Sequence, residues 1–264
     1  MRRHLVVGNW KMHGDIQHNQ LLLEGIEQGL NGHPNADYVV CVPNPYLFQA
    51  RALLANTQIA WGGQNVNQYE EGAFTGAVSP HMLTDLGCTY VILGHSERRT
   101  LFYETNLTAA AKFDAAIKGG LTPIFCVGET LLEHQEGLTE VIVASQMDAV
   151  IATLGEVAFQ QAMALNMVIA YEPVWAIGNG KAATPEQAQT VHQFIRNRLA
   201  KRNPQAAEQV RIIYGGSVRA SNAEALFSMP DVDGALVGGA SLLIDEFVAI
   251  CKAANHYATV CEAT

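Results

Sequence analysis

Three ionisable side chains of different kinds follow short apolar runs in this sequence: Lys11, His95 and Glu172. A carboxylate held near a substrate carbon in a dry site can act as a general base, and a histidine within reach can exchange protons with the same substrate. A lysine at the same place would stabilise negative charge that develops during the reaction and attract an anionic substrate. In one pocket, these groups would suit acid–base chemistry on a small anionic substrate.

Glycine-rich strings follow two later apolar runs. Gly215, Gly216 and Ser217 come after one run, and Gly238 and Gly239 come after the next. Glycine lets backbone N–H groups approach phosphate oxygens closely, so we expect the phosphate of a substrate to bind here.

The segment 173–181 has the composition of a lid. Pro173 lies at one end, Gly178 and Gly180 lie near the other, and Trp175 supplies an apolar cover. Closure would exclude water from the site and strengthen the electrostatic interactions within it.

Eight apolar runs rich in β-branched residues alternate with helical stretches, which indicates an α/β protein with a parallel sheet. The expected strands are 5–10, 38–43, 59–64, 90–94, 122–127, 168–171, 210–214 and 235–237. Helix starts are predicted at Thr130, Thr184 and Ser221, because each has Glu or Gln three residues later.

Eight such units predict a single closed (β/α)8 TIM barrel, with residues 1–264 as one domain and the polar residues gathered at the C-terminal ends of the strands. The alternative is an open doubly wound sheet, but no GxGxxG motif follows the first strand.

The net charge of −9 and the pI near 5.4 argue against general binding to nucleic acid or an anionic membrane. No run approaches the roughly 20 apolar residues that span a bilayer. Five cysteines with no CxxC pair favour a reduced, cytoplasmic protein, and no ligand cluster for a metal or redox cofactor is visible, so we expect neither. Cys126 is expected to be a buried strand residue without chemistry.

Six strings together resemble the triosephosphate isomerase family, in the family's order and over nearly the whole chain. They are 8–12 (GNWKM), 72–76 (GAFTG), 94–99 (GHSERR), 171–178 (YEPVWAIG), 214–218 (YGGSV) and 237–241 (VGGAS). The resemblance implies interconversion of dihydroxyacetone phosphate and D-glyceraldehyde 3-phosphate, in glycolysis and gluconeogenesis. It gives Glu172 the role of base and His95 that of a neutral electrophile at the start of a helix from Ser96, as this family exemplifies.

The resemblance also assigns roles to Lys11, to the phosphate site at Gly178, Ser217, Gly238 and Gly239, and to two further side chains. Asn9 either orients the carbonyl oxygen or braces Lys11. Glu97 either serves the site or forms an ion pair with Arg98 or Arg99. Asn179 stands where the family usually has threonine, which bears on the rate of lid motion.

The connection 64–79 is long for a barrel loop, and such loops are usually functional or disordered. The resemblance implies that its tip around Thr75 reaches into a second subunit, beside Asn9, Lys11 and His95, and makes a homodimer. Ala77 replaces the family's usual glutamate, so one carboxylate that would face a basic interface residue is missing.

Two rival functions remain at this point. Another phosphate-binding barrel, such as an aldolase or a tryptophan-pathway enzyme, would lack the lid motif that follows Glu172. A barrel kept only for binding or as a scaffold would have no need of Lys11, His95 and Glu172 together.

Overall fold

The computed structural model describes residues 2–165, 167–177 and 182–262, and these form one closed parallel barrel in the order β1 to β8. The strands are β1 Leu5–Asn9, β2 Asp37–Cys41, β3 Ile59–Gly63, β4 Tyr90–Leu93, β5 Thr122–Val127, β6 Val168–Tyr171, β7 Arg211–Tyr214 and β8 Gly234–Val237. Strand β1 pairs with both β2 and β8, which closes the barrel. The predicted fold is confirmed, and every strand bound lies within two residues of its expected place.

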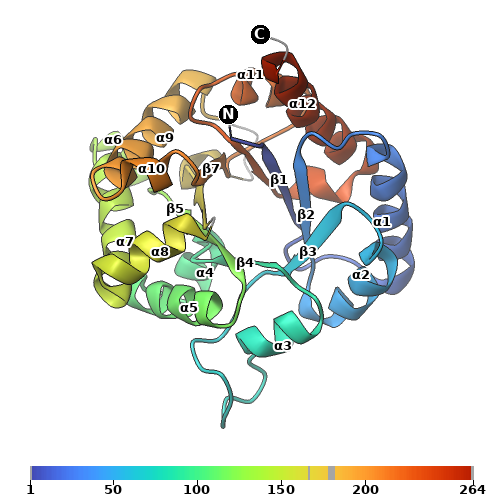
Figure 1. Ribbon diagram of the computed structural model, residues 1–264, viewed down its shortest axis with the longest axis horizontal. Helices are drawn as coiled ribbons and strands as arrows, with labels where there is room; N and C mark the ends of the chain where they lie inside the picture. Colours follow the sequence, from blue (N-terminus) through green and yellow to red (C-terminus); the bar gives the residue numbers. More distant parts are fainter. Residues whose placement is uncertain (1, 166, 178–181, 263–264) are drawn as a thin grey trace.

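The helices form a ring around the strands (Figure 1). They are α1 Ile16–Leu30, α2 Leu47–Leu54, α3 Pro80–Asp85, α4 Ser96–Leu101, α5 Asn106–Lys118, α6 Leu131–Gln135, α7 Thr139–Leu154, α8 Glu156–Ala164, α9 Pro185–Ala200, α10 Pro204–Ala207, α11 Ala220–Phe227 and α12 Ile244–Glu262, with short 3-10 helices η1 Asn44–Tyr46, η2 Val174–Ala176 and η3 Gly239–Leu242.

The predicted capping boxes at Thr130 and Thr184 are both confirmed. The predicted start at Ser221 is wrong, because α11 begins at Ala220 and its cap is Arg219. There the Asn222 side chain accepts the Arg219 N–H at 2.9 Å, so asparagine performs the role that was expected of Glu224.

Alternate strand residues face two separate apolar cores. Leu5 and Val7 of β1 belong to the small cluster inside the barrel, whereas Val6 between them packs outward with the helices. Strands buried on both faces need apolar residues at every position, which is why they read as continuous apolar runs in the sequence.

The segment 64–79 between β3 and α3 projects away from the body of the barrel (Figure 1). No single described helix is long and apolar enough to cross a membrane, although α7 and α8 would meet that test as one unit bent by 107°.

Candidate active site

Glu172 follows β6 directly and is almost completely buried, with 2% of its surface exposed. One carboxylate oxygen lies 2.9 Å from His95 Nε2, and the other accepts the backbone N–H of Ser96 at 2.9 Å. Two glycines make room for it. A Cβ at Gly128 would lie 1.8 Å from the Glu172 carbonyl oxygen, and one at Gly215 would lie 2.8 Å from Cγ.

His95 caps the N-terminus of α4, and its Nδ1 accepts the backbone N–H of Glu97 at 3.2 Å. An imidazole nitrogen that accepts a hydrogen bond carries no proton, so the neutral ring has its hydrogen on Nε2. That N–H is the group directed at Glu172, 2.9 Å away.

The charges of Glu172 and His95 are coupled. Burial raises the pKa of the Glu172 carboxyl, but His95 and the Ser96 N–H lower it more, so the carboxylate is ionised. Burial lowers the pKa of His95 while Glu172 raises it, with a net increase as long as the two are in contact. Protonation at Nδ1 would nevertheless oppose the Glu97 N–H, so we assign the neutral form at neutral pH.

Lys11 completes this side of the site. Its backbone has φ of 53°, a left-handed conformation uncommon outside glycine, and its N–H is held by the Asn9 side chain at 3.1 Å. The ammonium group lies 2.5 Å from Glu97. Glu97 therefore pairs with Lys11, and the predicted alternative of a pair with Arg98 or Arg99 is wrong.

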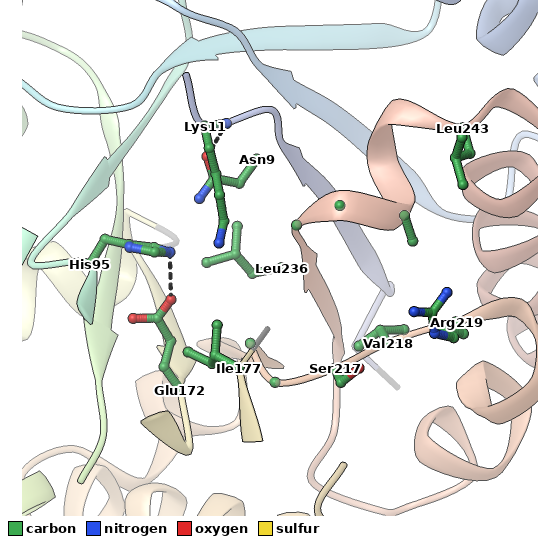
Figure 2. Close-up of a pocket in the computed structure, with 15 residues that line it drawn as sticks. Asn9, Lys11, His95, Glu172, Ile177, Ser217, Val218, Arg219, Leu236 and Leu243 are labelled. Carbon is green, nitrogen blue, oxygen red and sulfur yellow. Dashed lines mark hydrogen bonds and ion pairs between the residues drawn. The ribbon is translucent and has the colours of Figure 1, made fainter. Parts of the chain in front are cut away.

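These side chains line one wall of a cavity of about 330 Å³. Figure 2 shows Lys11, His95 and Glu172 grouped on one side of the cavity. Ser217 lies opposite them, in the loop that leads from β7 to α11. The lining residues are Asn9, Lys11, His95, Glu172, Ile177, Gly215, Gly216, Ser217, Val218, Arg219, Leu236, Gly238, Gly239, Ala240 and Leu243.

The glycines of this cavity serve two different purposes. A Cβ at Gly216 would lie 2.2 Å from the hydroxyl of Tyr214, so this glycine is required for packing. A Cβ at Gly239 would meet nothing within 4 Å and would occupy the cavity instead. Gly239 begins the 3-10 helix η3, and the first N–H groups of a helix have no acceptor within it. This wall suits an anion.

Comparison with known proteins agrees with this geometry. Residues 4–254 match the family model described as triosephosphate isomerase. The triosephosphate isomerase of Nitrosomonas eutropha is 54% identical over 254 residues, which cover 96% of this chain and 99% of the relative. That of Thiobacillus denitrificans is 55% identical over the same shares of the two chains. That of Cupriavidus necator is 51% identical over 96% of this chain and 100% of the relative.

The chain belongs to the triosephosphate isomerase family. Its reaction is the family's interconversion of dihydroxyacetone phosphate and D-glyceraldehyde 3-phosphate, a step of glycolysis and gluconeogenesis. The open doubly wound sheet is excluded by the closed barrel, and the aldolase and scaffold alternatives by the family assignment.

Several contacts of side chains in and around this site were not predicted. Ser96 was expected only as the start of a helix, yet its N–H holds Glu172. Glu129 is fully buried and accepts hydrogen bonds from the Tyr171 hydroxyl at 3.1 Å and from Trp175 Nε1 at 2.8 Å. The Tyr214 hydroxyl accepts the Ala183 N–H at 3.1 Å. Ser96, Tyr171 and Tyr214 lie within the strings that resemble the family, whereas Glu129 lies outside them, and in no case does the residue type alone indicate the contact that it makes.

Three predicted positions fall outside the described residues, namely Gly178 in the phosphate site and Asn179 and Gly180 in the lid. Cys126 lies inside the barrel, where burial raises the pKa of its thiol far above the usual value, so it is a poor nucleophile. Within the part of the chain that the structure describes, no three His, Cys, Asp or Glu side chains gather closely enough to hold a metal ion.

Proposed function

We propose that Glu172 is the base of this isomerase, that His95 is its electrophile and that Lys11 stabilises the charged intermediate. Glu172 removes a proton from C1 of dihydroxyacetone phosphate, and the electrons of that C–H bond form the enediolate. The same carboxyl then delivers its proton to C2, while His95 Nε2 exchanges a proton between the two oxygens. The observation that carries this proposal is the contact of Glu172 and His95 at one wall of the cavity, 2.9 Å apart.

Substrate binding should raise the pKa of Glu172 and lower that of His95, and both changes favour catalysis. The Glu172 carboxylate is held by His95 and Ser96, and a bound substrate would take the place of these partners. Burial then raises the pKa of Glu172 and makes it a stronger base. His95 loses the carboxylate that raised its pKa, and burial and Lys11 both lower it, which keeps the ring neutral.

We propose that Gly178, Ser217, Gly238 and Gly239 bind the substrate phosphate, with Asn9 bracing Lys11. The Asn9 side chain accepts the Lys11 N–H, which supports the bracing role. The Lys11 side chain also lies next to Gly238, because a Cβ added at Gly238 would lie 3.4 Å from Cε of Lys11. Glu97 orients Lys11 through their ion pair and His95 through its backbone N–H.

The segment 173–181 is proposed to close over the substrate as a lid. In the described part, Pro173 follows the base directly, and Ile177 already lines the cavity. Trp175 is held by Glu129 and stacks on His134, with 4.5 Å between ring centroids. An ordered aromatic anchor at one end gives the lid a fixed point about which to close.

A homodimer is proposed in which the tip of segment 64–79 enters a partner's site. A second cavity of about 310 Å³ lies beside Lys11 and His95, and exposed apolar side chains surround it, among them Met12 at 93% and Phe102 at 64% exposure. Phe74 in the segment is 42% exposed and stacks on Tyr69. Burial of these apolar groups against a second copy would remove them from water.

The replacement of glutamate by Ala77 should weaken this dimer little. Arg98 already has a partner within its own chain, because its Nε lies 3.0 Å from Glu104. An additional exposed ion pair would contribute only about 0 to 1 kcal/mol. We place this dimer in the cytoplasm, where its substrates are metabolised, and propose no cofactor, nucleic-acid or membrane partner.

A coupled assay with D-glyceraldehyde 3-phosphate tests the residue roles. Glu172→Gln keeps the shape of the side chain but removes the base, so kcat should fall by roughly 10²- to 10⁴-fold. Glu224→Gln, at an exposed carboxylate on α11, is the matched control and should be as active as the wild type. A Glu172→Gln enzyme with near-normal kcat would remove Glu172 from the mechanism.

A further inference from the structure

A buried histidine contacts residues that flank the candidate site but does not itself line the cavity. His192 on α9 is fully buried, and its ring packs against Tyr171 with centroids 5.9 Å apart in a T-shaped arrangement. The ring of Tyr214 lies on another side of it, with centroids 6.5 Å apart. Both distances are within the range of aromatic pair interactions.

Each of these tyrosines holds one end of the proposed lid. The Tyr171 hydroxyl donates to Glu129 at 3.1 Å, and the same carboxylate oxygen accepts from Trp175 at the start of the lid. The Tyr214 hydroxyl accepts the N–H of Ala183, two residues beyond the end of the segment. Tyr171 also directly precedes Glu172 in the chain.

His192 is itself firmly placed. Its Nδ1 lies 3.0 Å from the carbonyl oxygen of Asp231, and a carbonyl only accepts, so the proton is on Nδ1 and the ring orientation is fixed. The helix that carries it begins at Pro185, with a capping box at Thr184, directly after Ala183. A rigid element attached to one end of the lid therefore also contacts the tyrosine that serves the other end.

We infer that His192 is a positioning residue. Its ring fixes the positions of Tyr171 and Tyr214 relative to each other, and thereby couples the two ends of the lid. This inference rests on the proposed lid. It predicts that loss of the ring changes lid closure and catalysis, beyond any effect on stability. The ring contacts carry the coupling, and the hydrogen bond to Asp231 orients the ring.

Two substitutions separate the ring from its hydrogen bond. His192→Asn keeps a donor for Asp231 but removes the ring, and we expect kcat to fall and the Kd for 2-phosphoglycolate to rise, each on the order of tenfold. His192→Phe keeps the ring and should restore both values to within about threefold of the wild type. An asparagine variant that matches the wild type in both measurements would overturn the inference.

A stability control distinguishes positioning from packing. Leu199→Ala removes a fully buried side chain two turns further along α9. It should lower Tm at least as much as His192→Asn does. We expect its kcat and 2-phosphoglycolate affinity to be unchanged. If these values fall in step with Tm in both variants, His192 is only a packing residue and the inference is wrong.

A double-mutant cycle tests the route through the tyrosines. Tyr214→Phe removes the hydroxyl that holds Ala183, so His192→Asn should change the Kd less in that background than in the wild type. Additive effects would contradict the inference even if the single variant is impaired.

Limited proteolysis separates this inference from the lid on which it rests. In wild-type enzyme, 2-phosphoglycolate should protect the segment 173–181 from cleavage, and His192→Asn should need more ligand for the same protection. A wild type without protection would overturn the lid and the inference together. Equal protection of wild type and variant would overturn the inference alone.

Discussion

Acid should destabilise this protein through His192, by an amount that can be worked from its surroundings. Burial holds the pKa of the folded-state ring at about 4, well below its ordinary value of 6.5. Asp231 and Asp233 raise it and Arg196 lowers it, but burial dominates. Between these two pKa values the His192 ring is protonated in the unfolded chain but neutral in the folded one. The free energy of unfolding therefore decreases as the pH falls below about 6.5.

The magnitude follows from these two pKa values. At pH 8 both states are neutral at this residue, so it makes no pH-dependent contribution. At pH 5 the unfolded ring is almost fully protonated while the folded ring is mostly neutral, which costs about 2 kcal/mol of the free energy of unfolding. The loss is complete only below the folded-state pKa of about 4.

Urea unfolding at pH 8 and pH 5, at one fixed protein concentration, measures this effect in wild type and His192→Phe. Phenylalanine cannot titrate, and the other titrating groups, such as His4 with its lowered pKa, are common to both proteins and cancel in the difference. The variant should therefore gain about 2 kcal/mol relative to the wild type between pH 8 and pH 5. Parallel pH profiles for the two proteins would refute the reasoning.

Three further outcomes are expected. Gly239→Ala should fold with an unchanged Tm, because a Cβ there meets no neighbour, but should raise KM at least tenfold by filling the phosphate side of the cavity; an unchanged KM in kinetic assays would show that phosphate binds elsewhere. Thr75→Arg should give monomers with strongly reduced turnover in analytical ultracentrifugation and parallel assays, whereas a fully active wild-type monomer would disprove the shared site. Trp175→Phe removes the hydrogen bond to Glu129, so the first end of the proposed lid should lose a restraint worth about 1 kcal/mol and 2-phosphoglycolate should bind a few-fold more weakly in a fluorescence-free method such as calorimetry; an unchanged affinity would mean that this hydrogen bond does not serve the lid.

The approach of Glu172 to His95 illustrates which parts of the site were predictable. Both residues follow strands, and parallel strands of a barrel end on one face, so their convergence follows from the fold. The Lys11 pair with Glu97 was not predictable, because Arg98 and Arg99 are nearer in sequence and only the turn at Lys11 directs its ammonium to Glu97.

The role of a glycine is also only partly predictable from the sequence. Gly215 and Gly216 were expected to admit a phosphate, yet each is required first by a side chain that occupies the space of its Cβ, Glu172 in one case and Tyr214 in the other. A glycine in a sequence indicates that something approaches closely, but not whether that neighbour is a ligand or the protein itself.

The sequence alone determined the barrel, its strand bounds and the candidate side chains for the chemistry, because these depend on local periodicity and on residue type. Tertiary structure alone decided which buried polar groups meet. Ser96 holds Glu172, Glu129 holds Trp175, and His192 lies between two tyrosines from β6 and β7. These contacts join segments 21 to 76 residues apart, so no local pattern encodes them, and closure of the sheet is what brings the segments together.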